Sequence, residues 1–173
     1  MNEQVLVIDD EQDSVDSICD LLTVADISCR GETDAAKAIE SFHANPTDIV
    51  VVDYLLNGTA GITGLDVVAK LKDIKPFTRF VMISGWMRGE GDENERANKM
   101  KVAHFLRKPF DATELVSVVD ELLKNIEAKA NDWRAMAEEY VSVRKVSAEE
   151  VRAVNEEFKL EIIQAFERQE SND

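Results

Sequence analysis

Three acidic side chains, a serine and a lysine lie where neighbouring strands of a sheet would end, and together they could carry phosphoryl-transfer chemistry. Asp9, Asp53 and Ser84 each stand at or just beyond the end of a short apolar run. Asp10 directly follows Asp9, and Lys108 follows a weaker run. Side chains at the carboxyl ends of parallel strands converge on one crevice. We therefore expect one site with three carboxylates, a hydroxyl and an ammonium group, as a magnesium-dependent phosphoryl-accepting aspartate requires.

The elements expected to position these residues are short strands that alternate with helices as far as about residue 127. The expected strands are residues 5–8, 27–29, 49–52, 80–83 and 105–106. Apolar residues three and four positions apart predict helices between most of them. Strands that alternate with helices form parallel sheets covered on both faces. The sequence therefore predicts an α/β fold with a doubly wound, five-stranded parallel sheet.

A long helix is expected to begin after Asp111 and to extend beyond the sheet, to about residue 141. Leu115, Val118 and Leu122 mark a face that suits packing on the sheet. A second apolar series repeats at intervals of three and four, as in a coiled-coil seam. Its members are Val116, Val119, Leu123, Ile126, Ala130, Trp133, Ala137 and Tyr140. Ser147 is expected to begin one more helix.

These patterns divide the chain into a globular domain, residues 1–127, and a helical extension, residues 128–173. The extension holds seven Lys and Arg residues against eleven Asp and Glu residues. Because it is acidic and lacks a second globular pattern, a DNA-binding output is disfavoured. Three arrangements stay open for it, namely a coiled-coil homodimer, a hairpin that folds back on the long helix, and a plain helical cap.

The composition limits the partners and the compartment of the protein. The formal net charge of −15 repels phosphate backbones and anionic membranes, so neither nucleic acid nor a membrane is an expected partner. No run of about 18 apolar residues is present, and the N-terminus lacks the pattern of a secretion signal. The expected location is the cytoplasm. Cys19 and Cys29 share no metal-binding or redox spacing, and core packing is expected for both.

From about residue 3 to 127 the sequence resembles the receiver domain of bacterial response regulators, which has a flavodoxin-like fold. The order and spacing of several motifs carry this resemblance. They are Val-Ile-Asp9-Asp10-Glu, Val-Val-Asp53-Tyr-Leu, Ile-Ser84-Gly and Phe105-Leu-Arg-Lys108-Pro109-Phe110. The resemblance implies a two-component response regulator that takes its phosphoryl group from a histidine kinase or a histidine phosphotransfer protein and acts on a downstream protein target. It also implies that the protein is not an enzyme, apart from its own phosphorylation and dephosphorylation.

The resemblance assigns the metal ligands and the phosphoacceptor. Asp10 and Asp53 would bind Mg²⁺ directly, Asp9 through water, and the backbone carbonyl of Leu55 would add a ligand. Three converging carboxylates repel one another, and a divalent cation with oxygen ligands removes that conflict. Asp53 would attack the phosphorus of a phosphohistidine or of a small acyl phosphate.

The resemblance also assigns the residues that stabilise and report the phosphoryl group. Lys108 and the Ser84 hydroxyl would contact its oxygens. Once Ser84 moves, Phe105 could rotate inward as the aromatic switch residue. The Lys108–Pro109 peptide matches the family position for a cis bond that aims the lysine inward.

The sequence departs from the family in the loop after Asp53. Asn57 stands where the family commonly has proline, and a helix that begins at Gly64 would leave about three extra residues in the loop, although Gly61 keeps the usual spacing. Other interpretations of the acids remain. Asp9-Asp10 could cap the first helix. A haloacid-dehalogenase-like phosphatase would need Asp-x-Asp after the first strand and would leave Asp53 without a role, and a non-phosphorylated scaffold would not need the complete acid set.

Overall fold

The computed structural model describes residues 3–56, 61–85 and 100–144, with side chains as far as residue 129. It contains a five-stranded sheet in the order β2-β1-β3-β4-β5, and all four neighbouring pairs are parallel. The strands are β1 (Val5–Ile8), β2 (Cys29–Glu32), β3 (Ile49–Asp53), β4 (Arg79–Ser84) and β5 (His104–Arg107). This sheet confirms the predicted α/β fold and its five parallel strands.

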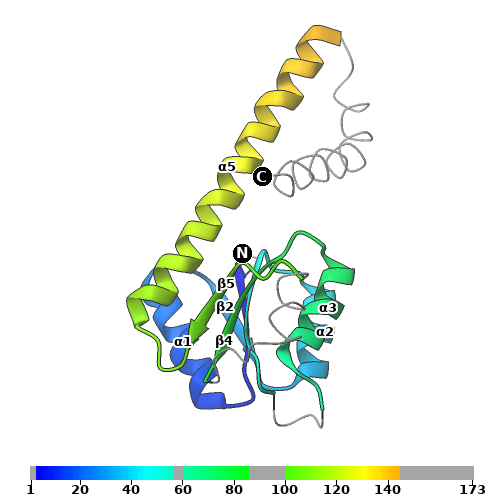
Figure 1. The fold of residues 1–173 in the computed structure, drawn as a ribbon. Coiled ribbons are helices and arrows are strands. Elements are labelled where there is room, and N and C mark those ends of the chain that lie inside the picture. The colour runs from blue at the N-terminus through cyan, green and yellow to red at the C-terminus, as the bar shows by residue number, and fades with distance from the viewer. Residues whose placement is uncertain (1–2, 57–60, 86–99, 145–173) are drawn as a thin grey trace. The chain divides into compact units, whose positions relative to one another are not determined.

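Helices cover both faces of the sheet (Figure 1). They are α1 (Gln12–Val24), α2 (Ala35–Ala44), α3 (Gly64–Ile74) and α5 (Ala112–Arg144). The first turns of α5 lie on the same side of the sheet as α1, and α2 and α3 lie on the other side. Each of α1, α2 and α3 buries residues spaced three and four apart, which is the stripe that packing on a sheet requires. Between β4 and β5 the sequence also predicts a weak helix at about residues 94–101, and most of these residues lie outside the described part of the chain.

The core lies on both sides of the central strands. Along β1, Leu6 and Ile8 belong to the cluster formed with α2 and α3. Val5 and Val7 alternate with them and are equally buried, so they face α1 and α5. Every residue of β1 and β3 is buried, as in strands covered on both faces. The side chains that follow these strands therefore start from a rigid, close-packed support.

Strand β2 lies two to three residues later than predicted. Ile27, expected in the strand, is buried in the connection from α1, and its amide donates to the carbonyl oxygen of Leu22. Asp26 before it takes a left-handed conformation with φ of 60°. The strand itself begins at Cys29, and it is an edge strand with no fully buried residue. An edge strand needs no apolar run, because one of its backbone edges is unpaired and its side chains are only partly covered.

Cys19 and Cys29 form a disulfide between α1 and β2, which corrects the expectation that both serve only in core packing. Both residues are half-buried, and their Cα atoms lie 5.7 Å apart. The close approach of the two elements is permitted by Gly31, where a Cβ atom would stand 2.0 Å from Cγ1 of Val15. A spacing of ten residues did not indicate this pairing, because the contact depends on how α1 packs against the edge strand.

Helix α5 spans Ala112–Arg144, which is 33 residues. Among its residues 112–129, whose side chains are described, Leu115, Val119 and Leu122 are buried and Val118 is half-buried. Val119 therefore packs in the core and was wrongly assigned to the outer seam. Contacts divide the chain into two units, Met1–Asn125 and Ile126–Asp173. The predicted boundary at residue 127 stays a prediction, and the helix expected from Ser147 lies outside the described residues.

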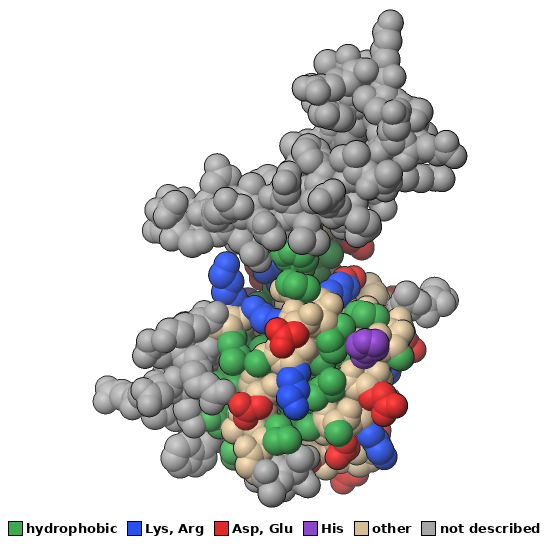
Figure 2. Space-filling view, turned by 90° about the vertical axis from the view of Figure 1, so that its right-hand side faces the viewer, with side chains coloured by type: hydrophobic (Ala, Val, Ile, Leu, Met, Phe, Trp, Pro, Cys, Tyr) green, Lys and Arg blue, Asp and Glu red, His purple; other side chains and the backbone are tan. Residues whose placement is uncertain are grey.

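Charged side chains of both signs are interspersed over the molecular face shown in Figure 2, which is seen from the side of α2 and α3. The described acidic and basic groups on that face are not gathered by sign. Within the described part of the chain, no helix is both long enough and apolar enough to cross a membrane.

Candidate functional site

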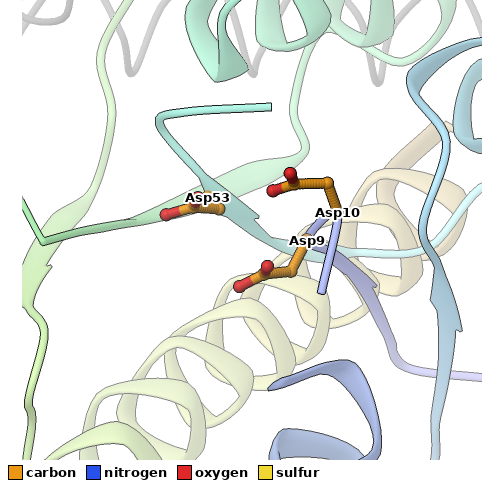
Figure 3. A group of neighbouring side chains, drawn as sticks. All are labelled: Asp9, Asp10 and Asp53. Atoms are coloured by element: carbon orange, nitrogen blue, oxygen red, sulfur yellow. The ribbon is translucent and has the colours of Figure 1, made fainter. Parts of the chain in front are cut away.

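Asp9, Asp10 and Asp53 converge at the carboxyl edge of the sheet, as the sequence predicts (Figure 3). One carboxylate oxygen from each lies within 4.8 Å of the other two. Asp9 is 1% exposed and Asp53 is 7% exposed, while Asp10 is half-buried. Three carboxylates at this separation are a set of hard oxygen ligands, which fits Mg²⁺ while leaving positions for water.

The sheet register explains why these acids meet. Ile8 of β1 pairs with Val52 of β3, so the next residues, Asp9 and Asp53, leave two neighbouring strands at the same level. Asp53 is itself the last residue of β3 and pairs with Ile83 of β4. Asp53 is thus held within a strand, and Asp9, the first residue after β1, is held by the hydrogen bond that its amide donates to the carbonyl oxygen of Glu32 at 3.3 Å.

Lys108 supplies the positive charge of the site. Its Nζ atom lies 2.6 Å from Oδ2 of Asp9 and 3.5 Å from Oδ1 of Asp53. The backbone amide of Lys108 donates to the carbonyl oxygen of Ser84 at 2.9 Å, so the chain after β5 continues beside the end of β4. The Lys108–Pro109 peptide bond is cis. The ammonium group therefore bridges the two most buried acids.

Burial and neighbouring charges together raise the pKa values of both Asp53 and Lys108. Burial raises the pKa of Asp53 to about 6, Lys108 opposes that rise, and the neighbouring acids Asp9 and Asp10 add to it. Burial tends to lower the pKa of Lys108, but the hydrogen bond to Asp9 and the attraction of Asp53 outweigh it and raise the pKa above its usual value. Three acids with Lys108 as the close cation among the described residues thus favour a further positive charge.

The other predicted site residues lie around this cluster. Ser84 is the half-buried last residue of β4. Phe105 lies on β5 with 45% of its surface exposed, next to Met82 of β4. Leu55, two residues after Asp53, is 42% exposed and forms an isolated bridge with Thr63. Asp9 and Asp10 do not cap α1, whose N-cap residue is Glu11 without a side-chain cap bond.

Ser14 belongs to the site, and the sequence analysis missed it. Its hydroxyl donates to Oδ2 of Asp9 at 2.6 Å, while the amide of Glu11 donates to Oδ1 at 3.0 Å. Ser14 lies in the first turn of α1, and helical side chains lean toward the N-terminus of their helix. The sequence did offer one indication of this contact, namely a serine in the first turn of the helix that follows the acidic end of β1.

Gly64 packs closely against the backbone of Asp53, and its replacement is expected to disturb the site. A Cβ atom on Gly64 would stand 2.2 Å from the backbone carbonyl oxygen of Asp53, so either α3 or Asp53 must shift. We expect Gly64→Ala to lower the free energy of unfolding by about 1–3 kcal/mol, as over-packing does. Urea unfolding measures this, with Gly85→Ala as control, because nothing lies within 4 Å of a Cβ there. Equal stability of the two variants would contradict the contact.

The architecture and the acid cluster define a class of protein, the parallel α/β domain with a candidate metal site at the carboxyl edge of its sheet, and comparison with known proteins identifies the family. The sequence model of the family described as "Response regulator receiver domain" matches residues 5–120. The chain belongs to this family. Helix α3 begins at Gly64, as the sequence analysis assumed for the loop after Asp53, so eleven positions separate Asp53 from the first residue of α3.

Similar proteins include regulators from several organisms. The chain is 24% identical over 127 residues to an uncharacterized transcriptional regulatory protein, YesN, from Bacillus subtilis, a match that covers 71% of this chain but 33% of that protein. The chain thus spans about a third of the relative's length. A CheY-like receiver domain from Methanospirillum hungatei has a TM-score of 0.66 at 16% identity and covers 75% of this chain and 99% of its own. The receiver domain of NtrX from Brucella abortus has a TM-score of 0.59 at 29% identity, covering 69% and 98%.

Proposed function

We propose that this protein is a two-component response regulator that accepts a phosphoryl group on Asp53 from a histidine kinase or a histidine phosphotransfer protein. The observation that carries the proposal is the convergence of three carboxylates with Lys108, whose ammonium lies 2.6 Å from Asp9 and 3.5 Å from Asp53. Asp10 and Asp53, the carbonyl of Leu55 and, through water, Asp9 would hold Mg²⁺. When bound, the cation would neutralise charge on the transferring phosphoryl group.

The proposed reaction is a displacement at phosphorus. A carboxylate oxygen of Asp53 attacks the phosphorus atom, and the bond from phosphorus to the histidine nitrogen of the donor breaks. The imidazole leaves with the bonding electron pair and takes a proton from solvent. Lys108 would approach the phosphoryl oxygens that appear on Asp53, and Ser84 would donate its hydroxyl to one of them.

The proposed response to phosphorylation involves two residues at the ends of β4 and β5. Ser84 would move toward the new phosphoryl oxygens. Phe105, which is 45% exposed in this structure, would then rotate into the space behind Ser84. Burial of an exposed aromatic ring changes the surface at β5, which is how the signal would reach a downstream protein.

The proposed output is protein–protein interaction rather than DNA binding, and a homodimer through the helical extension is one form of it. The acidic composition of residues 128–173 supports this, because the segment holds eleven acidic residues and seven basic ones. The length of α5, which continues to Arg144, supports a role for the extension in assembly. A cytoplasmic location is proposed together with this role.

Phosphorylation from acetyl phosphate tests the proposal. We expect the protein to gain the mass of one phosphoryl group when it is incubated with acetyl phosphate and Mg²⁺, and to gain none in EDTA. Intact-protein mass spectrometry follows the reaction, and borohydride trapping followed by peptide mapping locates the modified aspartate. Modification at Asp9 or Asp10, or no modification at all, would reject Asp53 as the acceptor.

Acetyl phosphate labelling, together with a phosphatase assay, separates the proposed function from the two alternatives. A haloacid-dehalogenase-like phosphatase would hydrolyse a phosphomonoester such as p-nitrophenyl phosphate with turnover. A scaffold that is never phosphorylated would stay at its original mass and would bind its partner equally with or without acetyl phosphate. Sizing of the unmodified and phosphorylated protein tests whether assembly follows phosphorylation.

A further inference from the structure

Both oxygens of the Asp9 carboxylate accept hydrogen bonds, and Ser14 and Lys108 donate to the same oxygen. Oδ1 accepts from the amide of Glu11 at 3.0 Å. Oδ2 accepts from the Ser14 hydroxyl and from the Lys108 ammonium, each at 2.6 Å. Because Asp9 is 1% exposed, bulk water is poorly placed to replace a donor that leaves. Ser14 is therefore the described protein donor that stays on Oδ2 when Lys108 moves away.

The proposed phosphorylation of Asp53 requires such a movement. In this structure Nζ of Lys108 is closer to Asp9 than to Asp53, by 2.6 Å against 3.5 Å. A phosphoryl group on Asp53 would present several charged oxygens to the ammonium, which favours short charge-assisted hydrogen bonds. The ammonium would then leave Oδ2 of Asp9, which is buried. The free-energy cost of this movement depends on whether another hydrogen-bond donor stays on Oδ2.

We propose that Ser14 is a positioning residue that allows Lys108 to transfer from Asp9 to the phosphoryl group. Its hydroxyl keeps Oδ2 of Asp9 hydrogen-bonded while the ammonium moves. The inference rests on the proposed function, and it adds a residue that acts through Asp9. Without the hydroxyl, Lys108 would be the remaining donor seen on Oδ2, so the lysine would be held more strongly on Asp9.

The local structure makes Ser14 suited to this role. Its backbone amide donates to the carbonyl oxygen of Glu11 at 3.0 Å, so the first turn of α1 fixes its position. Threonine would keep the hydroxyl at the same Cβ atom. Ser17, one turn further along α1, provides a matched control, because its hydroxyl donates to the carbonyl oxygen of Asp13 and it is exposed.

The first test compares initial rates of phosphorylation of the full chain by acetyl phosphate in Mg²⁺, followed by intact mass. We expect Ser14→Ala to react roughly tenfold more slowly, since a hydrogen bond to a buried charged group is lost. Ser14→Thr is expected to stay within about twofold of wild type, as is Ser17→Ala. A wild-type rate in Ser14→Ala would overturn the inference.

The second test shows whether Ser14 acts through Lys108. In a Lys108→Ala background no ammonium has to leave Asp9, so adding Ser14→Ala should slow the reaction by less than about twofold. An equal slowing in both backgrounds would assign Ser14 a merely structural role and overturn the inference while leaving the proposed function intact. Failure of wild type itself to be phosphorylated would instead overturn the proposed function, and the inference with it.

Discussion

Replacement of Asp53 by asparagine is expected to abolish phosphorylation and, at the same time, to stabilise the metal-free protein. Asparagine keeps the shape of the side chain but removes the nucleophilic carboxylate, so no phosphoryl group can be accepted at this position. It also removes a charge that is 7% exposed and lies beside two other acids. A functional group whose loss stabilises the fold is the expected sign of a site built for chemistry.

The size and pH dependence of the stabilisation follow from the pKa of Asp53. Burial and the neighbouring acids raise this pKa from 3.8 to about 6 in the folded protein. The folded state therefore binds the proton more tightly than the unfolded state. The corresponding stability is fully present below about pH 3.8 and is lost as pH rises through about 6. Asparagine cannot ionise, so above that window we expect the variant to be more stable than wild type by on the order of 2 kcal/mol in EDTA.

Urea unfolding of wild type and Asp53→Asn in EDTA, from pH 4 to pH 8, measures this difference. The advantage of the variant should be small at the acidic end and should grow through the window near pH 6. Asp48→Asn is a control, because Asp48 lies away from the acid cluster and its carboxylate has 50% exposure. A variant that is less stable than wild type at pH 8 would show that Asp53 is not destabilising in the folded state.

The strands that carry the acids could be predicted because they are buried on both faces. Continuous apolar runs such as residues 49–52 have few alternatives in a chain whose other segments show helical spacing. Because parallel strands align their carboxyl ends, the meeting of Asp9 with Asp53 followed from the runs alone. The central sheet and the acid cluster were therefore accessible from one sequence.

Features that depend on packing between elements were not accessible in the same way. The edge strand Cys29–Glu32 has the sequence Cys-Arg-Gly-Glu, which contains no apolar run. The disulfide between Cys29 of this strand and Cys19 depends on the packing of α1 against Gly31, which is a tertiary contact. The hydroxyl of Ser14 likewise contacts Asp9 only because the turn after β1 brings α1 back over the strand end. In each case a local pattern carries too little information about the partner.

Replacement of Lys108 by alanine is expected to have a large effect on both stability and reactivity. The ammonium is hydrogen-bonded to Asp9, which is 1% exposed, and it is the described cation that lies within 4.0 Å of both Asp9 and Asp53. Removing one partner of a buried ion pair leaves the other charge without compensation. We expect the free energy of unfolding in EDTA to fall by about 2–4 kcal/mol at neutral pH.

The loss of reactivity has a separate cause. In the proposed reaction Lys108 would meet the charge that develops on the phosphoryl oxygens, and loss of one such donor lowers rates by on the order of a hundredfold. Acetyl phosphate in Mg²⁺ should therefore still modify Asp53 in Lys108→Ala, but over hours. Lys75→Ala is the matched control, because Lys75 makes a 2.6 Å ion pair with Asp48 at a partly exposed position remote from the acid cluster. Its stability should fall by no more than about 1 kcal/mol, and its phosphorylation rate should not change.

Magnesium separates the electrostatic role of Lys108 from a packing role. If the lysine mainly balances the charges of Asp9, Asp10 and Asp53, a divalent cation should restore part of the lost stability, because binding to the folded state alone stabilises it. Thermal unfolding of Lys108→Ala with increasing Mg²⁺ should therefore show a larger rise in Tm than unfolding of wild type. The side chain is 28% exposed, so its stem is mostly buried and a packing contribution has to be separated from the effect of the charge. Equal rises in Tm for both proteins would assign the loss to packing and remove Lys108 from the charge balance of the site.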